Sequence, residues 1–155
     1  MQIVEFVDFK CPYCTLFAQS LDSLFAMYPG EIHVSIRNFP LSVHRHAQIA
    51  ARAAECSVEH KAFSAFHEHA YDFPDSVWSS AEEIAGEIGV LDRPGFLSCV
   101  ESDWAAQQVV RDSLDGVKAG IAGTPLVIIN GWRFPGTPSL DDMLRLIERE
   151  RLLAR

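Results

Sequence analysis

The sequence lacks long apolar runs, an excess of positive charge, and any repeated or low-complexity segment. No stretch approaches the ~18 apolar residues of a membrane span, which argues against a direct crossing of a bilayer. The 13 Lys and Arg residues are outnumbered by 21 Asp and Glu residues, and the net charge is -8. This charge argues against a nucleic-acid or anionic-membrane surface, since both need clustered positive charge.

The N-terminal segment also lacks the character of a signal peptide, because Glu5 and Asp8 interrupt its apolar run. The chain begins almost inside its first expected strand, which we interpret as a trimmed or engineered start, with any leader or anchor lost. The start therefore indicates no compartment by itself. The length of 155 residues, with 48% hydrophobic and 22% charged residues, is typical of one globular domain.

Two of the four cysteines form a Cys-x-x-Cys motif at Cys11 and Cys14, where a strand-like run gives way to a helical pattern. Pro12 suits the first helical position because it has no N–H to leave unpaired. The free N–H groups and the dipole at a helix N-terminus stabilise an anion, so we expect Cys11 to be more acidic than a free thiol. Cys14 can then resolve a mixed disulfide on Cys11, which makes the pair a reversible two-electron switch.

A Cys-x-x-Cys motif can also be half of a zinc site or a pair of inert buried thiols. Zinc needs two further ligands, usually as a second close pair. Cys56 and Cys99 are 43 residues apart and have no such neighbour, so no metal site is expected.

The histidines also give no metal signature, because their close pairs are two residues apart and do not share a helix face. We interpret them as surface or boundary residues, with His44 near the expected active-site side able to tune its charge. The close pairs are His44 with His46 and His67 with His69.

The predicted order of elements is strand, helix, strand, a run of helices, two strands and a helix. The first helix ends at Pro29-Gly30, and residues 32–37 alternate as a strand does. Strand, helix and strand in this order predict a βαβ unit with parallel pairing. Further helices are expected over 47–54, 63–73 with its end at Pro74, 81–88 with Ser79 or Ser80 as cap, 94–100 and 104–117.

The C-terminal part predicts a return to the sheet. Residues 126–129 form an apolar run, and Asn130-Gly131 before Trp132 is the strongest short-range hairpin signal. A last helix follows over 140–147, capped by Ser139. We therefore divide the chain into a frame of residues 1–41 and 121–155 and an inserted helical subdomain of residues 42–120, within one structural unit.

The element order, the thiol pair at the first helix and the late Gly123-Thr124-Pro125 resemble the DsbA-like thiol-disulfide oxidoreductases. The resemblance spans nearly the whole chain and implies an α/β, thioredoxin-like fold with a helical insertion. It is most specific at residues 5–14, 39–41 and 123–131. Glutaredoxins also use Cys-Pro-Tyr-Cys, but they lack a helical insert between the thiols and the proline. Here 111 positions separate Cys14 from Pro125.

The resemblance implies that Pro125 is in cis beside the thiols; the alternative is an ordinary trans turn proline. The backbone of Thr124 would then pair with an extended segment of a substrate protein, next to Pro12 and Tyr13. Strongly oxidising DsbA proteins carry His where this chain has Tyr13, and Tyr supplies no positive charge at neutral pH. We therefore predict a weaker oxidant, closer to glutaredoxin or protein disulfide isomerase.

Two further roles come from the same resemblance. Glu5 shares a strand face with Ile3 and Val7, and burial of that face would raise its pKa. The implied role of Glu5 is a proton relay for Cys14, whereas the alternative is an acid at a solvent-facing sheet edge. Cys56 and Cys99 would form a second, structural disulfide, and two separate buried thiols are the alternative.

The implied function is that of a protein thiol-disulfide oxidoreductase with no cofactor besides the Cys11–Cys14 disulfide. Its partners would be thiol- or disulfide-containing proteins and a membrane quinone-linked protein that re-oxidises it. The implied location is extracytoplasmic, in the periplasm or cell envelope, with the cytoplasm as the alternative.

Three other functions stay open. The first is a cytosolic reductase linked to glutathione or thioredoxin reductase. The second is a glutathione-dependent isomerase or kappa-class transferase, which Cys14 counts against because those proteins usually lack the resolving cysteine. The third is a non-redox binding module that uses the surface near Pro125.

Overall fold

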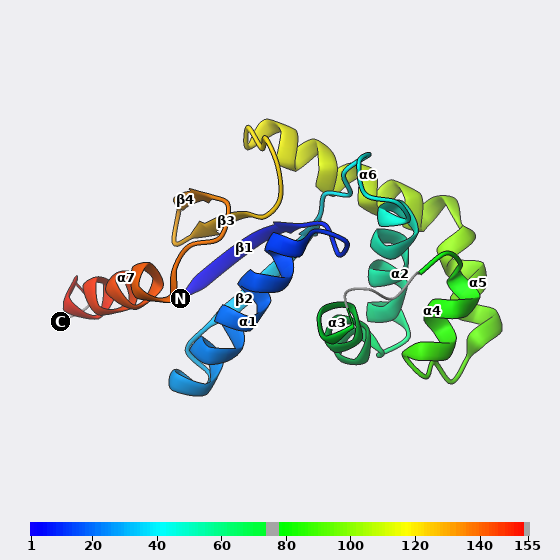
Figure 1. The fold of residues 1–155 in the computed structure, drawn as a ribbon, viewed down its shortest axis with the longest axis horizontal. Helices are drawn as coiled ribbons and strands as arrows, with labels where there is room; N and C mark the ends of the chain where they lie inside the picture. The colour runs from blue at the N-terminus through cyan, green and yellow to red at the C-terminus, as the bar shows by residue number, and fades with distance from the viewer. Residues whose placement is uncertain (74–77, 154–155) are drawn as a thin grey trace.

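The computed structural model describes residues 1–73 and 78–153, and its centre is a four-stranded sheet (Figure 1). The strand order is β2 (His33–Asn38), β1 (Gln2–Val7), β3 (Leu126–Ile129) and β4 (Trp132–Pro135). β1 pairs in parallel with β2 and antiparallel with β3, and β3 and β4 form an antiparallel hairpin. The predicted parallel βαβ unit and the hairpin are therefore confirmed.

α1 (Pro12–Met27) connects β1 to β2. Gly30 follows its end with a positive φ of 77°, a conformation that suits glycine. β2 starts at His33, one residue later than predicted. Because β2 is an edge strand, its apolar residues Val34 and Ile36 are only half-buried.

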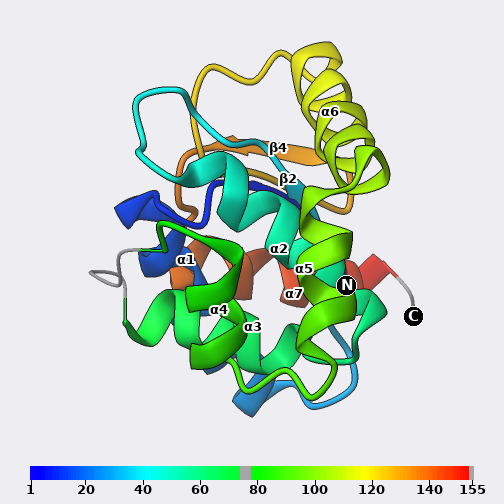
Figure 2. The same ribbon diagram turned by 90° about the vertical axis from the view of Figure 1, so that its right-hand side faces the viewer.

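Helices cover both faces of the sheet, as Figure 2 shows. α1 and α7 (Leu140–Leu153) share a core with β1 and β3. α6 (Asp103–Lys118) lies against the opposite face, where a Cβ on Gly116 would come within 2.7 Å of the Phe39 ring. Glycine therefore allows the close approach of α6 to the sheet. The buried side chains of the core between the sheet and these two helices, α1 and α7, include Ile3, Phe17, Leu21, Leu24, Val127, Met143 and Ile147.

The described residues form five helices between β2 and β3 in the chain, and α6 is the last of them. Figure 1 shows the other four, α2 (Ala47–Glu59), α3 (Phe63–Asp72), α4 (Ala81–Glu87) and α5 (Arg93–Glu101), on the side of the molecule away from α7. Ser80 accepts the Glu83 N–H, while the Glu83 carboxylate accepts the Ser79 N–H, so these residues cap α4 as predicted. The predicted end of α3 at Pro74 lies outside the described residues.

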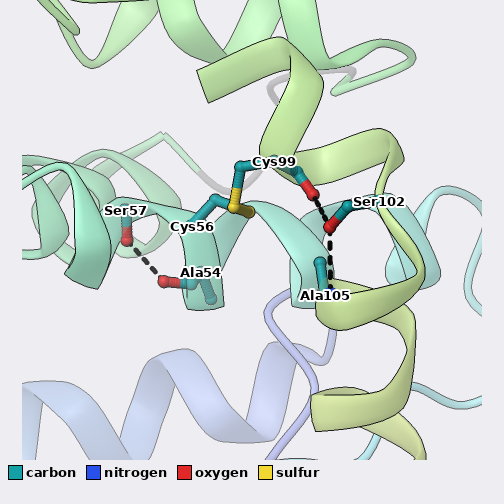
Figure 3. Close-up of a disulfide and its surroundings, with 6 residues drawn as sticks. All are labelled: Ala54, Cys56, Ser57, Cys99, Ser102 and Ala105. Atoms are coloured by element: carbon teal, nitrogen blue, oxygen red, sulfur yellow. Dashed lines mark hydrogen bonds between the residues drawn. A yellow bond between two sulfur atoms is a disulfide. The ribbon is translucent and has the colours of Figure 1, made fainter. Parts of the chain in front are cut away.

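A disulfide joins Cys56 of α2 to Cys99 of α5, with 5.9 Å between the Cα atoms (Figure 3). The predicted pairing is therefore present in the structure. The Ser102 hydroxyl donates to the Cys99 carbonyl and accepts the Ala105 N–H, which caps α6 directly after α5. The disulfide thus anchors the α5–α6 corner to α2.

Within the described residues, no helix combines the length and the apolar character needed to cross a bilayer. α1 and α6, for example, each have 16 residues, whereas a transmembrane helix needs about 20.

Removing the disulfide should destabilise the helical block. The double variant Cys56→Ala/Cys99→Ala opens a cross-link between residues 43 apart, and the chain-entropy model assigns such a loop ~4 kcal/mol. We expect the free energy of unfolding in urea to fall by that order. Cys11→Ala/Cys14→Ala serves as the control, because it also removes two thiols but no link between α2 and α5. Equal stability of the two double variants, or free thiols at Cys56 and Cys99 after alkylation without reductant, would contradict the assignment.

Candidate active site

The two motif thiols lie where β1 passes into α1. The Cys11 N–H donates to the Asp8 carbonyl at 2.9 Å, and Cys11 is the N-cap of α1 with Pro12 at the first helical position. The side chain of Cys11 is 4% exposed and that of Cys14 is fully buried. Both cysteines are free thiols in this structure. The sequence placed them correctly because a strand followed by proline fixes where the helix begins.

Thr124 lies against Cys11 although 113 positions separate them, and the Thr124–Pro125 peptide bond is cis, as predicted. When protonated, the Cys11 thiol donates to the Thr124 carbonyl at 3.3 Å. The sheet explains the contact: Phe6 pairs with Leu126 in the antiparallel β1–β3 ladder, so the end of β1 meets the start of β3. Thr124 and Pro125 directly precede that start and are both buried.

The environment of Cys11 lowers the pKa of its thiol to about 5. The largest cause is a hydrogen bond from the Cys14 thiol, and Thr124 and the backbone N–H groups of Cys14 and Tyr13 lower the pKa further, while burial opposes them. These N–H groups belong to the first turn of α1, where they have no helical partner. At pH 7 Cys11 is therefore a thiolate, the nucleophilic form of the side chain.

Cys14 has the opposite tendency. Burial is the main cause that raises the pKa of its thiol, and the hydrogen bond with Cys11 and the charge of Glu5 add to the rise. The backbone N–H of Asp8 partly offsets it. Cys14 therefore remains a thiol and serves as the donor that stabilises the neighbouring thiolate.

Glu5 is buried below this pair, with its side chain 2% exposed and its Oε1 atom without a hydrogen-bond partner in the structure. Burial, followed by the charge of Cys11, raises the pKa of the Glu5 carboxyl to about 8. The alternative position at a solvent-facing edge is wrong, because β1 lies inside the sheet between β2 and β3. A carboxyl with this pKa can hold or release a proton near neutral pH.

Asp8 belongs to the site, although its role was missed from the sequence. Its Oδ1 atom accepts the Lys10 N–H and its Oδ2 atom accepts the Leu41 N–H, both at 2.8 Å, while His44 Nδ1 lies 2.7 Å from Oδ2. Asp8 therefore fixes the loop before Cys11 to the segment after β2. A signal was present, since an acid in a buried apolar run needs such partners.

Tyr71 of α3 was also missed. It is buried, and its hydroxyl, like Glu5 Oε1 and Thr124 Oγ1, has no hydrogen-bond partner in the structure. Burial, and then the charges of Glu5 and Cys14, hold the pKa of the phenol well above its ordinary value. No short-range pattern in the sequence connects a helix of the inserted block to the thiols.

The surface around Cys11 is exposed and partly apolar. Tyr13 is 63% exposed, Leu16 next to it on α1 is also exposed, and Pro12 faces solvent. The Thr137 hydroxyl donates to the Tyr13 carbonyl at 3.1 Å, which ties the start of α1 to the segment before α7. An exposed apolar surface of this kind can contact a polypeptide.

The histidines do not form a metal site. His44 pairs with Asp8, and His69 Nε2 lies 2.7 Å from the Glu87 carboxylate. Across residues 1–73 and 78–153, no group of three or more His, Cys, Asp or Glu side chains is placed to hold a metal ion.

The geometry supports thiol–disulfide exchange. It combines a buried thiolate, a thiol within hydrogen-bonding reach, and a buried carboxyl whose pKa lies near neutrality. A metal ion is not required for this chemistry, in which one thiolate attacks the sulfur of a disulfide.

Comparisons with known proteins agree with this geometry. A family model described as thioredoxin matches residues 1–149. The Na(+)/H(+) antiporter NhaA of Herminiimonas arsenicoxydans is 28% identical over 154 residues, which are 97% of this chain and 24% of the relative. The chain thus spans about a quarter of the length of that relative.

Solved structures share the fold. A thioredoxin-like oxidoreductase from Silicibacter pomeroyi has a TM-score of 0.83 at 24% identity, over 97% of this chain and 86% of that one. The thiol-disulfide exchange protein alpha-DsbA2 from Wolbachia pipientis has a TM-score of 0.80 at 22% identity, over 96% and 80%. A periplasmic thioredoxin-like protein from Salmonella enterica serovar Typhimurium has a TM-score of 0.75 at 25% identity, over 96% and 82%. The predicted thioredoxin-like fold with a helical insertion, as in DsbA-like proteins, is confirmed.

The acidity of Cys11 can be measured by the pH dependence of its alkylation in the reduced protein. We expect a midpoint near pH 5, with slow reaction below it, where the thiol is protonated. Cys14→Ala removes the main hydrogen-bond donor and should slow alkylation below pH 7 by ~tenfold. Cys14→Ser keeps a donor and is the matched control. A midpoint near that of free cysteine in the unsubstituted protein would rule out the assigned role of Cys11.

Glu5→Gln should change how stability depends on pH. The unfolded chain releases the Glu5 proton near its ordinary pKa of 4.5, whereas the folded chain keeps it up to about 8. Stability should therefore fall between these values by on the order of 4 kcal/mol, and the neutral Gln variant should lack this fall. The Cys11 thiol acts with the opposite sign in both proteins, so the difference between them reports Glu5. Urea unfolding at pH 5 and pH 8 tests this, with exposed Glu101→Gln as control; parallel curves for all three proteins would refute it.

Proposed function

The chain belongs to the thioredoxin family, and from this premise we propose that it is a protein thiol-disulfide oxidoreductase acting through the Cys11-Pro12-Tyr13-Cys14 centre. The observation that carries the proposal is the pairing of an acidic Cys11 with a Cys14 that stays protonated, next to the cis peptide at Thr124–Pro125. This difference in acidity gives the two sulfurs different roles.

In the oxidising direction a substrate thiolate attacks the Cys11 sulfur of the Cys11–Cys14 disulfide. The sulfur–sulfur bond breaks, and Cys14 leaves with the electron pair and takes a proton from the buried Glu5 carboxyl, whose pKa burial raises. A second substrate thiolate then attacks the substrate sulfur of the mixed disulfide. Cys11 leaves as the stable thiolate, so two substrate thiols are oxidised and the centre is reduced.

Substrate binding is proposed at the surface that surrounds Cys11. The backbone of Thr124 would pair with an extended substrate segment, as in strand addition. Pro12 and Tyr13 supply an exposed apolar contact beside the sulfur. The partners would be proteins with thiols or disulfides that are unfolded or locally extended.

We place the chain outside the cytoplasm, in the periplasm or cell envelope. Disulfides such as Cys56–Cys99 persist in oxidising compartments and are rare in the cytosol, which supports this placement. Re-oxidation of the centre would come from a membrane quinone-linked protein, and no cofactor besides the Cys11–Cys14 disulfide is required.

The oxidising strength is proposed to be intermediate. A pKa of about 5 for Cys11 lies between the values of about 3.5 for DsbA and about 7 for thioredoxin. The more the thiolate is stabilised, the more the reduced form is favoured, so the reduction potential should lie near the ~-180 mV of protein disulfide isomerase. Tyr13 in the motif agrees with this, because it adds no positive charge beside the thiolate.

A second candidate is a binding module that regulates an antiporter without redox chemistry. The match of almost the whole chain to a quarter of an NhaA antiporter favours it. Cys11→Ser separates the two: binding to such a transporter that survives this substitution would favour the binding module.

Reactivation of reduced, unfolded ribonuclease tests the proposed function. The oxidised chain should restore ribonuclease activity, and Cys11→Ser should abolish this because no sulfur is left to accept the substrate thiolate. Cys14→Ser should instead accumulate the mixed disulfide, which gel electrophoresis without reductant detects. Equilibration with glutathione buffers in the same preparation gives the reduction potential.

Two outcomes would contradict the proposal. Faster reduction of insulin with glutathione than oxidation of ribonuclease would identify a reductase. A potential as high as the ~-120 mV of DsbA would show that Tyr13 does not weaken the oxidant.

A further inference from the structure

A groove lies beside the sheet, away from Cys11 and Pro125. It has a volume of about 570 Å³ and is formed by α1, β2 and α3, which stand next to one another in Figure 1. A second cavity of about 230 Å³ contacts the same two residues of β2, Val34 and Ile36, and extends toward α2. Together they follow the outer edge of β2.

Within residues 1–73 and 78–153, no strand lies beside the backbone groups of that edge. β2 is the terminal strand of the sheet, and the N–H groups of His33 and Phe39 donate inward, to Met1 and Val7. Because direction alternates along a strand, the amides of Val34 and Ile36 point outward. The outward N–H of Asn38 is already held by Asp112 Oδ2 at 2.8 Å, so the open part of the edge centres on Val34 and Ile36.

The floor of the groove is apolar. Phe25 of α1, a large side chain that is 41% exposed, lines it together with Phe63 of α3 and the half-buried Val34 and Ile36. Exposed aromatic surface inside a concave site is a usual feature of binding sites.

The rim of the groove is negative. Asp22 of α1 and Glu68 and Asp72 of α3 are exposed along it, and among the described residues that line the groove none is Lys or Arg. Burial lowers the pKa of His67, the remaining titratable group in the rim apart from buried Tyr71, so it is neutral at pH 7. The groove thus offers three carboxylates to a cationic ligand.

We propose that this groove docks an extended, basic segment of another protein. The backbone of the segment pairs with β2 at Val34 and Ile36, an apolar side chain contacts Phe25 on the floor, and Lys or Arg side chains meet the rim carboxylates. A second copy of this chain fits poorly, because it carries a net charge of -8 and the same acidic groove. The site is distinct from the redox centre of the proposed function.

The test uses the isotope-labelled full chain and two synthetic peptides, acetyl-Lys-Thr-Leu-Thr-Lys-amide and its Glu counterpart. We expect the Lys peptide to shift the Val34 and Ile36 amide signals in saturable fashion, more weakly at high salt, and the Glu peptide to leave them unchanged. Asp22→Lys/Asp72→Lys should weaken binding roughly tenfold. Glu101→Lys/Glu148→Lys, two exposed acids outside the groove, is the matched control.

Backbone pairing is tested by N-methylation of the Lys peptide, once at both Thr residues and once at Leu. Alternate amides of a strand face its partner, so either the two Thr amides or the Leu amide would donate to β2. N-methylation of the amides that face β2 should abolish binding, and N-methylation of the others should not. Equal binding of both versions, equal affinity for the Lys and Glu peptides, or concentration-dependent dimerisation through β2 would overturn the proposal.

The outcome is separable from the proposed oxidoreductase activity. Ribonuclease oxidation should be unchanged in Asp22→Lys/Asp72→Lys, and Cys11→Ser should bind the Lys peptide normally. Loss of both properties in either variant would show that the groove is not an independent site.

Discussion

The active site is organised around a single negative charge, which resides on the Cys11 sulfur. Its environment lowers the pKa of this one group and raises the pKa of the three buried groups around it, Glu5, Cys14 and Tyr71. Burial is the first cause in all three, because a low-dielectric site disfavours each additional charge. The charge settles on Cys11 because it alone lies at the helix N-terminus and receives the Cys14 hydrogen bond. When a disulfide forms and this thiolate disappears, the same site allows Glu5 to release its proton more easily.

The sheet makes this arrangement possible. Antiparallel pairing of β1 with β3 brings the Thr124–Pro125 peptide to the thiols, and parallel pairing with β2 brings the Leu41 N–H to the Asp8 carboxylate. Each contact lies at the end of β1, where the strand register fixes position to within one residue. A slip of one residue would turn Glu5 out of the core and would place Phe6 in its position, since side chains alternate along a strand. The proposed redox chemistry therefore depends on the strand register as much as on the identity of the motif residues.

Features of the fold and the site that depend on residues close together in the sequence could be predicted, and features that depend on tertiary packing could not. The strand–helix boundary at Cys11 and the cap of α4 depend on neighbouring residues. The sequence located the boundary and narrowed the cap to Ser79 or Ser80, of which the structure has Ser80. The cis bond at Pro125 and the Cys56–Cys99 disulfide came from the family resemblance, because no local pattern specifies them. Tyr71 and the Asp8–His44 pair escaped prediction, since they depend on how the helical block packs against the frame. The groove beside β2 escaped for the same reason: its walls come from α1 and α3, which no local signal relates.

The long insertion between β2 and β3 affects the entropic cost of folding more than it affects the geometry around Cys11. Bringing Cys11 to Thr124 closes a loop of 113 positions, but the entropic cost of closure grows only with the logarithm of loop length. The Cys56–Cys99 disulfide lies entirely inside that loop and shortens the effective path by a covalent link between α2 and α5. It therefore limits the conformations of the insertion without constraining the ends that meet at the active site. The same insertion supplies Tyr71 to the candidate active site and α3 to the wall of the groove. The insertion therefore contributes to both sites, whereas the strands of the sheet bring Thr124 to Cys11.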